Sequence, residues 1–67
     1  MKMISVESSN LKAIGFENNT LRILFDGGGL YEYYDVPKSV FAHFLMSDSK
    51  GKFVAKNIKG KYDFKKI

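Results

Sequence analysis

Apolar and polar residues alternate through the first half of the chain. Residues 10–16 and 20–25 both follow a period of two, which is typical of β-strands with one buried face. The residues between them are Asn18 and Asn19, and asparagine tolerates a positive φ, so this segment predicts a two-residue hairpin loop. The pairs that this loop sets opposite each other are Phe16 with Leu21 and Ile14 with Ile23.

A second hairpin is expected to turn through Asp26 and the glycines 27–29, which adopt positive φ at low cost. The glycines allow more than one register. A three-residue loop that starts at Asp26 sets Arg22 opposite Glu32, whereas a slip of one residue would place Glu32 on the face of Ile23. We therefore expect the first register, whose further pairs are Leu24 with Leu30, Ile23 with Tyr31, and Leu21 with Tyr33.

These registers divide the strand residues between the two faces of a three-stranded antiparallel meander. The first face holds Ile14, Phe16, Leu21, Ile23, Tyr31 and Tyr33. The second face holds Leu11, Ala13, Leu24, Leu30 and Tyr34 beside Arg22 and Glu32. Because the second face is more apolar than a fully hydrated surface usually is, it is a candidate site for a protein partner or for self-association.

Helical periodicity replaces the alternation after the third strand. Val36-Pro37 ends the extended region, and proline suits the first position of a helix because its missing N–H has no partner there. Residues 37–47 then carry an apolar stripe formed by Val40, Phe41, Phe44 and Leu45. This spacing predicts a helix that covers the first face of the sheet.

A second, shorter helix is expected to follow. Ser47 or Ser49 can cap its start, and it would extend toward Asn57 and end near Gly60. Its predicted buried residues are Phe53, Val54 and Ile58. Residues 62–64 alternate like a short closing strand. Together the elements predict an α+β fold, in which a small three-stranded antiparallel meander is packed on one face by one longer and one short helix.

Length and composition limit the classes of protein to which the chain can belong. Its 67 residues form one small domain, residues 1–67, and they include no cysteine, so neither disulfides nor thiolate metal sites are expected. No apolar run is long enough for a signal peptide or a membrane span. We therefore expect a cytoplasmic protein without a membrane partner.

The charges are unevenly distributed along the chain. Residues 50–67 contain seven bases and one acid, a net charge of about +6, whereas residues 1–49 contain four bases and six acids, about −2. A clustered positive field attracts polyanions, so RNA or another polyanion is a candidate partner. A merely hydrated, solubilising surface is the open alternative.

Few residues are candidates for catalysis. His43 is the only histidine, and its predicted place on the helix is at the boundary of the apolar stripe or exposed to solvent. The carboxylates are dispersed, since Glu17 and Asp26 fall at opposite ends of one strand. The glycines 27–29 join two strands and precede no helix, so they indicate a hairpin turn and not a phosphate loop. We predict a protein that is not an enzyme, with no catalytic residues, metal site or cofactor.

A row of lysines is the strongest candidate for a binding surface. Lys52, Lys56 and Lys59 recur at the spacing of one helix face, and Lys61, Lys65 and Lys66 follow them. Such a row can neutralise a phosphate backbone. Tyr34 and Tyr62 are the candidates for stacking on bases, whereas Tyr31 and Tyr33 are interpreted as core residues beneath the helix, with base stacking as the alternative.

The order of these features resembles the KTSC domain, a short module named for its occurrence at the C-terminus of some lysyl-tRNA synthetases and also found in small stand-alone bacterial and phage-type proteins. The resemblance covers residues 6–64 and is strongest at the central Tyr-x-Tyr. It is carried by Val6, Ser8, Ser9, the run Ala13 to Phe16, Leu21, Ile23, Phe25, Tyr31, Tyr33, Val36, Pro37, Ser49, Gly51, Phe53, Ile58 and Tyr62.

The resemblance implies a small module of unestablished function, for which RNA binding has been suggested, largely because of the association with the synthetases. It supplies no catalytic residues. The matched positions that are expected to serve the fold are Tyr31, Tyr33, Pro37, Ser49, Gly51 and Phe53. We therefore predict a non-enzymatic module that binds RNA with low sequence specificity, with protein–protein interaction or homodimer formation through the second face as the alternative.

Overall fold

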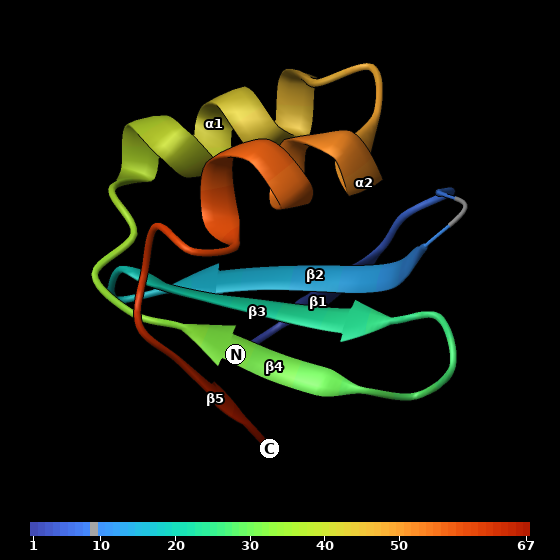
Figure 1. Cartoon of the computed structure of the whole chain (residues 1–67), viewed down its shortest axis with the longest axis horizontal. Helices are drawn as coiled ribbons and strands as arrows, with labels where there is room; N and C mark the ends of the chain where they lie inside the picture. Colours follow the sequence, from blue (N-terminus) through green and yellow to red (C-terminus); the bar gives the residue numbers. More distant parts are fainter. Residues whose placement is uncertain (9) are drawn as a thin grey trace.

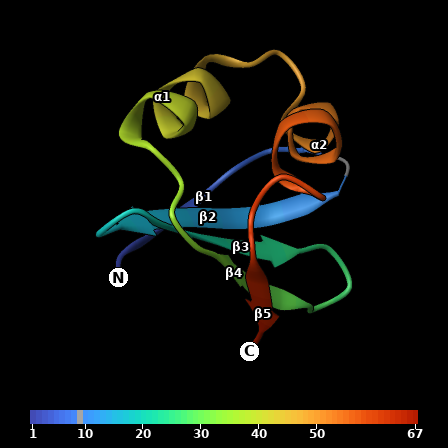
Figure 2. The same ribbon diagram turned by 60° about the vertical axis from the view of Figure 1, so that its left-hand side comes forward.

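The computed structural model of the chain describes residues 1–8 and 10–67; Ser9, which contributes to the family resemblance, lies outside them. A five-stranded antiparallel sheet in the order β1-β2-β3-β4-β5 is covered on one face by a helical layer (Figures 1 and 2). The strands are β1 Met3–Ser5, β2 Leu11–Glu17, β3 Thr20–Phe25, β4 Leu30–Tyr33 and β5 Phe64–Lys66. The helices are α1 Lys38–Met46 and α2 Lys50–Phe53, and α2 continues directly into the π-helical segment η1 Val54–Ile58.

The expected three-stranded meander is wrong in the number of strands, although the α+β class is correct. Five strands are present because each end of the chain adds a three-residue strand, β1 at one edge and β5 at the other. Most residues of both edge strands are exposed, so no hydrophobic alternation marked β1 and the closing strand was expected at 62–64 instead of Phe64–Lys66. Backbone pairing with β2 and β4 holds these strands in place.

Both predicted hairpin registers are confirmed. In the first hairpin Phe16 pairs with Leu21 and Ile14 with Ile23, and the loop residues Asn18 and Asn19 have φ values of 50° and 61°. In the second hairpin Arg22 pairs with Glu32, Leu24 with Leu30, Ile23 with Tyr31, and Leu21 with Tyr33. The asparagine loop therefore predicted the first register correctly, and the pairing of opposite charges and of apolar residues predicted the second.

The expected place of Leu11 on the second face is wrong. A β-bulge between Leu11 and Ala13 sets Leu11 opposite Phe25, and Leu11 is only 2% exposed. An extra residue in one strand reverses the alternation of side chains on its far side. Leu11 therefore joins the core, and the apolar part of the second face is smaller than expected.

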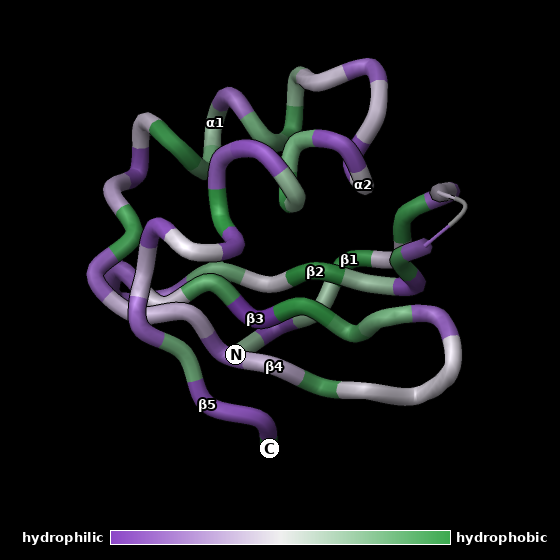
Figure 3. Tube along the Cα trace, in the orientation of Figure 1, coloured by the Kyte–Doolittle hydropathy of each residue, from purple (hydrophilic) through white to green (hydrophobic). Residues whose placement is uncertain are grey.

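The core lies between the first face of the sheet and the helices, and Figure 3 shows hydrophobic segments on both sides of it. Phe44 of α1 stacks on Phe53 of α2 with ring centroids 5.2 Å apart, and Phe41 stacks on Phe16 of β2 at 4.6 Å. Leu45, expected in the apolar stripe, is 44% exposed. The buried core residues are Leu11, Ile14, Leu21, Ile23, Tyr33, Val36, Phe44, Val54 and Ile58.

The helix ends follow the expected chemistry with small shifts. Pro37 is the residue before α1, with φ −64° and ψ 150°, and not its first helical residue. The Ser49 hydroxyl accepts a hydrogen bond from the Lys52 backbone N–H at 3.4 Å and so caps α2. Lys50 Nζ donates to the Leu45 and Ser47 carbonyls, each at 3.0 Å. These bonds tie the end of α1 to the start of α2, so the two helices form one layer.

An ion pair lies on the second face of the sheet. Arg22 donates to Glu32 Oε2 through both Nε, at 3.0 Å, and Nη2. The Tyr34 hydroxyl donates to the other carboxylate oxygen at 3.1 Å. Hydrogen bonding from Arg22 lowers the pKa of the Glu32 carboxyl, although partial burial opposes this effect. The pKa of Tyr34 is raised by burial and by its hydrogen bond to Glu32.

The lowered pKa of Glu32 predicts acid sensitivity. A carboxyl whose pKa is lower in the folded than in the unfolded state stabilises the fold above its unfolded pKa, and this stabilisation is lost as the pH falls through the folded pKa. Glu32→Gln should therefore lower the melting temperature at about pH 7, and the difference from the wild type should shrink toward about pH 3. Glu7→Gln, at an exposed carboxylate, is the control. A difference in melting temperature between Glu32→Gln and the wild type that stays constant from about pH 7 to about pH 3 would contradict the prediction.

A tyrosine-lined cleft as the candidate functional site

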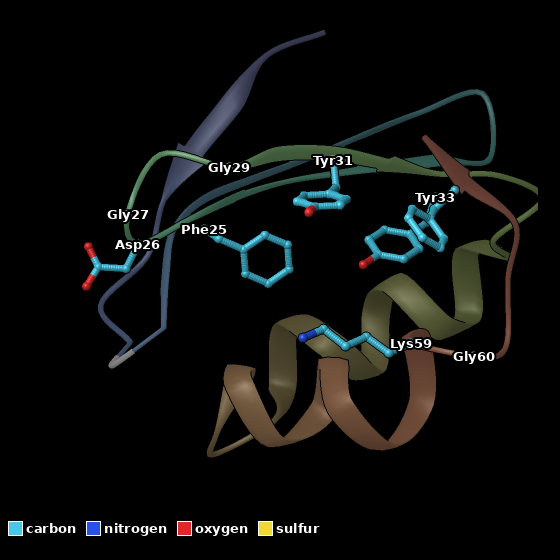
Figure 4. A pocket seen from close by; sticks show the side chains of 9 residues that line it. Phe25, Asp26, Gly27, Gly29, Tyr31, Tyr33, Lys59 and Gly60 are labelled. Atoms are coloured by element: carbon cyan, nitrogen blue, oxygen red, sulfur yellow. The ribbon is translucent and has the colours of Figure 1, made fainter. Parts of the chain in front are cut away.

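An open cleft of about 530 Å³ lies between the first face of the sheet and the end of η1 (Figure 4). The glycine turn between β3 and β4 forms one end of it, and the chain that leads from η1 into β5 forms the other side. Its lining residues are Phe25, Asp26, Gly27, Gly29, Tyr31, Tyr33, Lys59, Gly60 and Phe64.

Four aromatic rings from three strands meet in this cleft. Tyr31 and Tyr33 are two residues apart on β4, so both lie on the first face, with ring centroids 6.5 Å apart. Tyr33 pairs with Phe64 of β5, which brings the Phe64 ring within 5.6 Å of Tyr33 and 5.9 Å of Tyr31. The Phe25 ring meets Tyr31 edge-on at 5.4 Å. Strand pairing therefore assembles a continuous aromatic wall.

The rings of this wall differ in exposure. Tyr33 is only 3% exposed, Tyr31 is half-buried, and Phe64 is 58% exposed. Burial raises the pKa of the Tyr33 hydroxyl, and the neighbouring Tyr31 adds to the effect. The hydroxyls of Tyr31 and Tyr33 point into the cleft (Figure 4). In residues 1–8 and 10–67 the only tyrosine hydroxyl with a hydrogen-bond partner is that of Tyr34. The two cleft hydroxyls can therefore bond to water or to a ligand.

Lys59 forms the wall opposite the tyrosines. Its backbone N–H donates to the Val54 carbonyl at 2.8 Å and closes η1. Gly60, with φ 77°, then turns the chain away toward β5. The Lys59 ammonium lies 5.3 Å from the centroid of the Phe25 ring, a cation–π contact. The cleft thus combines an aromatic wall with one lysine, and the Asp26 side chain at the glycine turn adds a negative charge to its lining.

A glycine permits the position of the Tyr31 ring. A Cβ added to Gly29 would lie 3.1 Å from Tyr31 Cε1, closer than ordinary van der Waals contact. The absence of a side chain at Gly29 lets the ring lie along the turn. The turn therefore shapes the cleft as well as reversing the chain.

Three predicted contact residues meet in a second hollow. Tyr34, Lys61 and Tyr62 line it together with Asp35 and Asp63, and its volume is about 660 Å³. Tyr62 is also packed against the core. The two carboxylates offset the charge of Lys61, so this hollow is less suited to a polyanion than the cleft at Lys59.

The other predicted lysines do not line the cleft. Lys52 and Lys56 are exposed on α2 and η1, and the π-helical winding of η1 differs from the spacing on which their predicted alignment depends. Lys65 pairs with Glu32, which places it on the second face of the sheet, opposite to the cleft. Its neighbour Lys66 pairs with Tyr31 and is therefore on the cleft side.

The remaining family positions lie at packing and capping sites. Ser49 caps α2, and Phe53 stacks on Phe44. A Cβ on Gly51 would lie 3.0 Å from Asn10 Nδ2, so the glycine lets α2 approach the start of β2. Tyr31 and Tyr33 combine a packing role with a place in the cleft.

Sequence reasoning missed Phe25 and Phe64 as cleft residues. Phe25 could have been found, because it continues the alternation of Leu21 and Ile23 onto the first face. The position of Phe64 depends on the register of β5, for which the chain carries no turn signal.

His43 is exposed, as predicted. It lies at the edge of a hollow that also includes Phe53, Lys61 and Tyr62. Within residues 1–8 and 10–67, no three His, Asp or Glu side chains gather in an arrangement able to hold a metal ion. In the same part of the chain, neither length nor hydropathy would let any helix cross a membrane.

Comparisons with known proteins agree with the resemblance seen in the sequence. The family model of the KTSC domain matches residues 7–62 of this chain. A lysine–tRNA ligase from Nostoc punctiforme is 39% identical over 67 residues, which cover 97% of this chain but only 12% of that enzyme. A small protein from Tsukamurella paurometabola is 39% identical over 62 residues, which cover 90% of this chain and 92% of that protein.

A solved structure supports the same assignment. The crystal structure of a KTSC domain protein from Yersinia pestis superimposes with a TM-score of 0.95 at 37% identity, covering 98% of this chain and 96% of that chain. The match of the family model and this shared fold together show that the chain belongs to the KTSC domain family.

Proposed function

We propose that this protein is a non-enzymatic module that binds single-stranded RNA with low sequence specificity. The observation that carries the proposal is the cleft at Lys59, where a lysine faces an aromatic wall within the most basic part of the chain. Single-stranded nucleic acids bind where cations contact the phosphates and aromatic rings stack on the bases.

Lys59, Lys61 and Lys66 are the proposed phosphate contacts. Lys59 and Lys66 flank the aromatic wall, and Lys61 follows Lys59 along the same connection to β5. In the part of the chain that the structure describes, none of the three forms a salt bridge. The charges of Lys59 and Lys66 are therefore available to an anionic backbone, whereas the charge of Lys61 is partly offset by Asp35 and Asp63 beside it. Lys65 is left out of this set because it faces Glu32.

Low sequence specificity for RNA is expected because the chain contains a single arginine. Arg22 is paired with Glu32 on the second face, so it is not available for bidentate contacts to base edges. Stacking on aromatic rings accepts every base. We therefore expect similar affinities for single strands of different sequence.

The relatives give independent support. A lysine–tRNA ligase contains a segment 39% identical to this chain. A segment of an enzyme whose name specifies tRNA as its substrate is a natural place for an RNA-binding module. Because the chain spans only 12% of that enzyme, the ligase activity is not part of the proposal.

A salt titration tests RNA binding. Fluorescence anisotropy with a labelled single-stranded RNA should show binding at low salt, and the logarithm of the association constant should fall with log[salt] at a slope of about −2 for three phosphate contacts. Lys59→Gln and Lys66→Gln should each reduce the magnitude of this slope by about 0.7. No binding at low salt, or an affinity independent of salt, would refute the proposal.

Lys65→Gln is the matched control. It removes the same charge from the residue next to Lys66, but on the other face of the sheet. It should leave the slope close to that of the wild type. An equal effect of Lys65→Gln and Lys66→Gln would mean that only the overall charge matters and would reject the proposed surface.

The second face is the less favoured binding surface. Leu11 belongs to the core and not to this face, and the ion pair of Arg22 and Glu32 occupies part of the remaining surface of the face. The hypothesis of self-association through this face predicts a mass that rises with concentration in sedimentation experiments. A constant monomer mass would reject it.

A further inference from the structure

We infer that the cleft holds one unpaired base of the bound strand, with the base against Tyr31 and Phe64 and a flanking phosphate at Lys59. This inference rests on the proposed function and names the unit that the cleft recognises. It goes beyond backbone binding, because a lysine surface alone would bind any polyanion of the same charge.

The shape of the cleft fits a nucleotide unit. Its volume of about 530 Å³ lies within the range of small-molecule sites, about 300–1,000 Å³. Phe64 is 58% exposed and borders the half-buried Tyr31, with their ring centroids 5.9 Å apart. The two ring planes are tilted by 44°, so a planar ligand that stacks on the exposed Phe64 ring meets Tyr31 at an angle. A base of a stacked duplex cannot reach the Phe64 ring without leaving the stack.

The polar groups of the cleft match the two ends of a nucleotide. The Tyr31 and Tyr33 hydroxyls point into the cleft and can bond to the edge of a base (Figure 4). Lys59 stands on the opposite wall, with its ammonium in contact only with the Phe25 ring among the interactions of the described residues. A phosphate is a stronger partner for an ammonium than an aromatic face. Lys59 can therefore exchange this contact for a phosphate.

Other classes of ligand use these groups less completely. An aliphatic anion would engage Lys59 but not the four rings, and a neutral apolar ligand would bury a lysine without a partner. A planar ring that carries an anionic group engages both walls. In RNA, that ligand is a nucleotide with an unpaired base.

The test compares two single strands of equal length and charge, an oligouridine and its abasic counterpart. The wild type should bind oligouridine about fivefold or more tightly than the abasic strand, the gain expected for one stacked base. Phe64→Ala should abolish most of that preference and leave binding to the abasic strand unchanged. Phe64 is exposed on an edge strand, so its removal leaves the core intact.

Two further variants separate the parts of the cleft. Lys59→Gln should weaken binding to both strands, because both carry phosphates. Met46→Ala, at an exposed residue of α1 that lines neither the cleft nor the second hollow, should change neither affinity. The far-ultraviolet circular dichroism of each variant should match that of the wild type.

The outcomes distinguish the two proposals. Equal binding of the base-bearing and abasic strands by the wild type would overturn the base site while leaving RNA binding in place. Unchanged preference in Phe64→Ala would do the same. Failure of either strand to bind at low salt would reject the proposed function and this inference together.

Discussion

Phe44→Ala is expected to leave much of the protein unfolded at 37 °C. Phe44 is fully buried and stacks on Phe53 with ring centroids 5.2 Å apart. Truncation of a buried phenylalanine to alanine costs about 3–5 kcal/mol through lost burial and the cavity left behind. At roughly 0.05–0.15 kcal/mol per residue, a domain of this length has a total stability of about 3–10 kcal/mol. The substitution therefore removes a large share of it.

Urea denaturation followed by circular dichroism measures this loss. The midpoint should shift strongly to lower urea, and a folded baseline should be difficult to reach. Met46→Ala is the control on the same helix, because Met46 is 81% exposed, and it should change the stability by less than about 0.5 kcal/mol. A loss below about 1 kcal/mol for Phe44→Ala would mean that the helical layer is not packed as described.

Gly15→Val is expected to release β1 from the sheet. A Cβ at Gly15 would lie 2.7 Å from Met3 Sδ and 3.0 Å from the Lys2 carbonyl oxygen. The methionine can move aside, but the carbonyl belongs to the backbone that leads into β1. Overpacking of this kind typically costs about 1–3 kcal/mol. We expect a stability loss in this range, concentrated at the edge of the sheet.

Amide hydrogen exchange locates the effect. Met3 to Ser5 should lose protection in Gly15→Val, while β3 and β4 keep theirs. Adding Met3→Ala to Gly15→Val should recover part of the stability, since it removes the closer of the two contacts. Ala13→Val, on the same face of β2, is the control. Full protection of β1 in Gly15→Val would contradict the close approach of the N-terminal segment.

The hairpins were predictable because their determinants are local. Asn18 and Asn19 supply the positive φ values of one turn, and glycines supply those of the other. The pairing of Arg22 with Glu32 then follows from the requirement that apolar residues share a face. Ser49 could be predicted as one of two candidate caps, with Ser47 as the other, because a capping serine acts on a backbone N–H three residues away.

The bulge at Leu11 shows the limit of this reasoning. One extra residue in β2 moves Leu11 from the second face to the core. No residue typical of turns marks the position of this bulge in the sequence. The two edge strands show the same limit. They bury little apolar surface, so the pattern by which strands are identified is absent from them.

The candidate site depended on contacts between distant segments. The basic character of residues 50–67 is visible in the chain, but the alternation of β5 assigns Lys65 to Glu32 and Lys66 to Tyr31. The π-helical winding of η1 likewise changes the lysine spacing expected for an α-helix. The count of charges therefore identified the basic segment, residues 50–67, but not which of its lysines share a face with the cleft.

By itself, the sequence determined the central hairpins with their registers, the helices that cover them and the separation of charge, because each depends on neighbours within a few residues or on a simple period. Only the tertiary structure decided that Tyr31, Phe64 and Lys59 share one cleft, since that requires β5 to return beside β4 and η1 to end above Phe25. Long-range pairing of this kind is set by the packing of the whole domain. The sequence of a weakly patterned segment such as β5 does not by itself show which strand it pairs with.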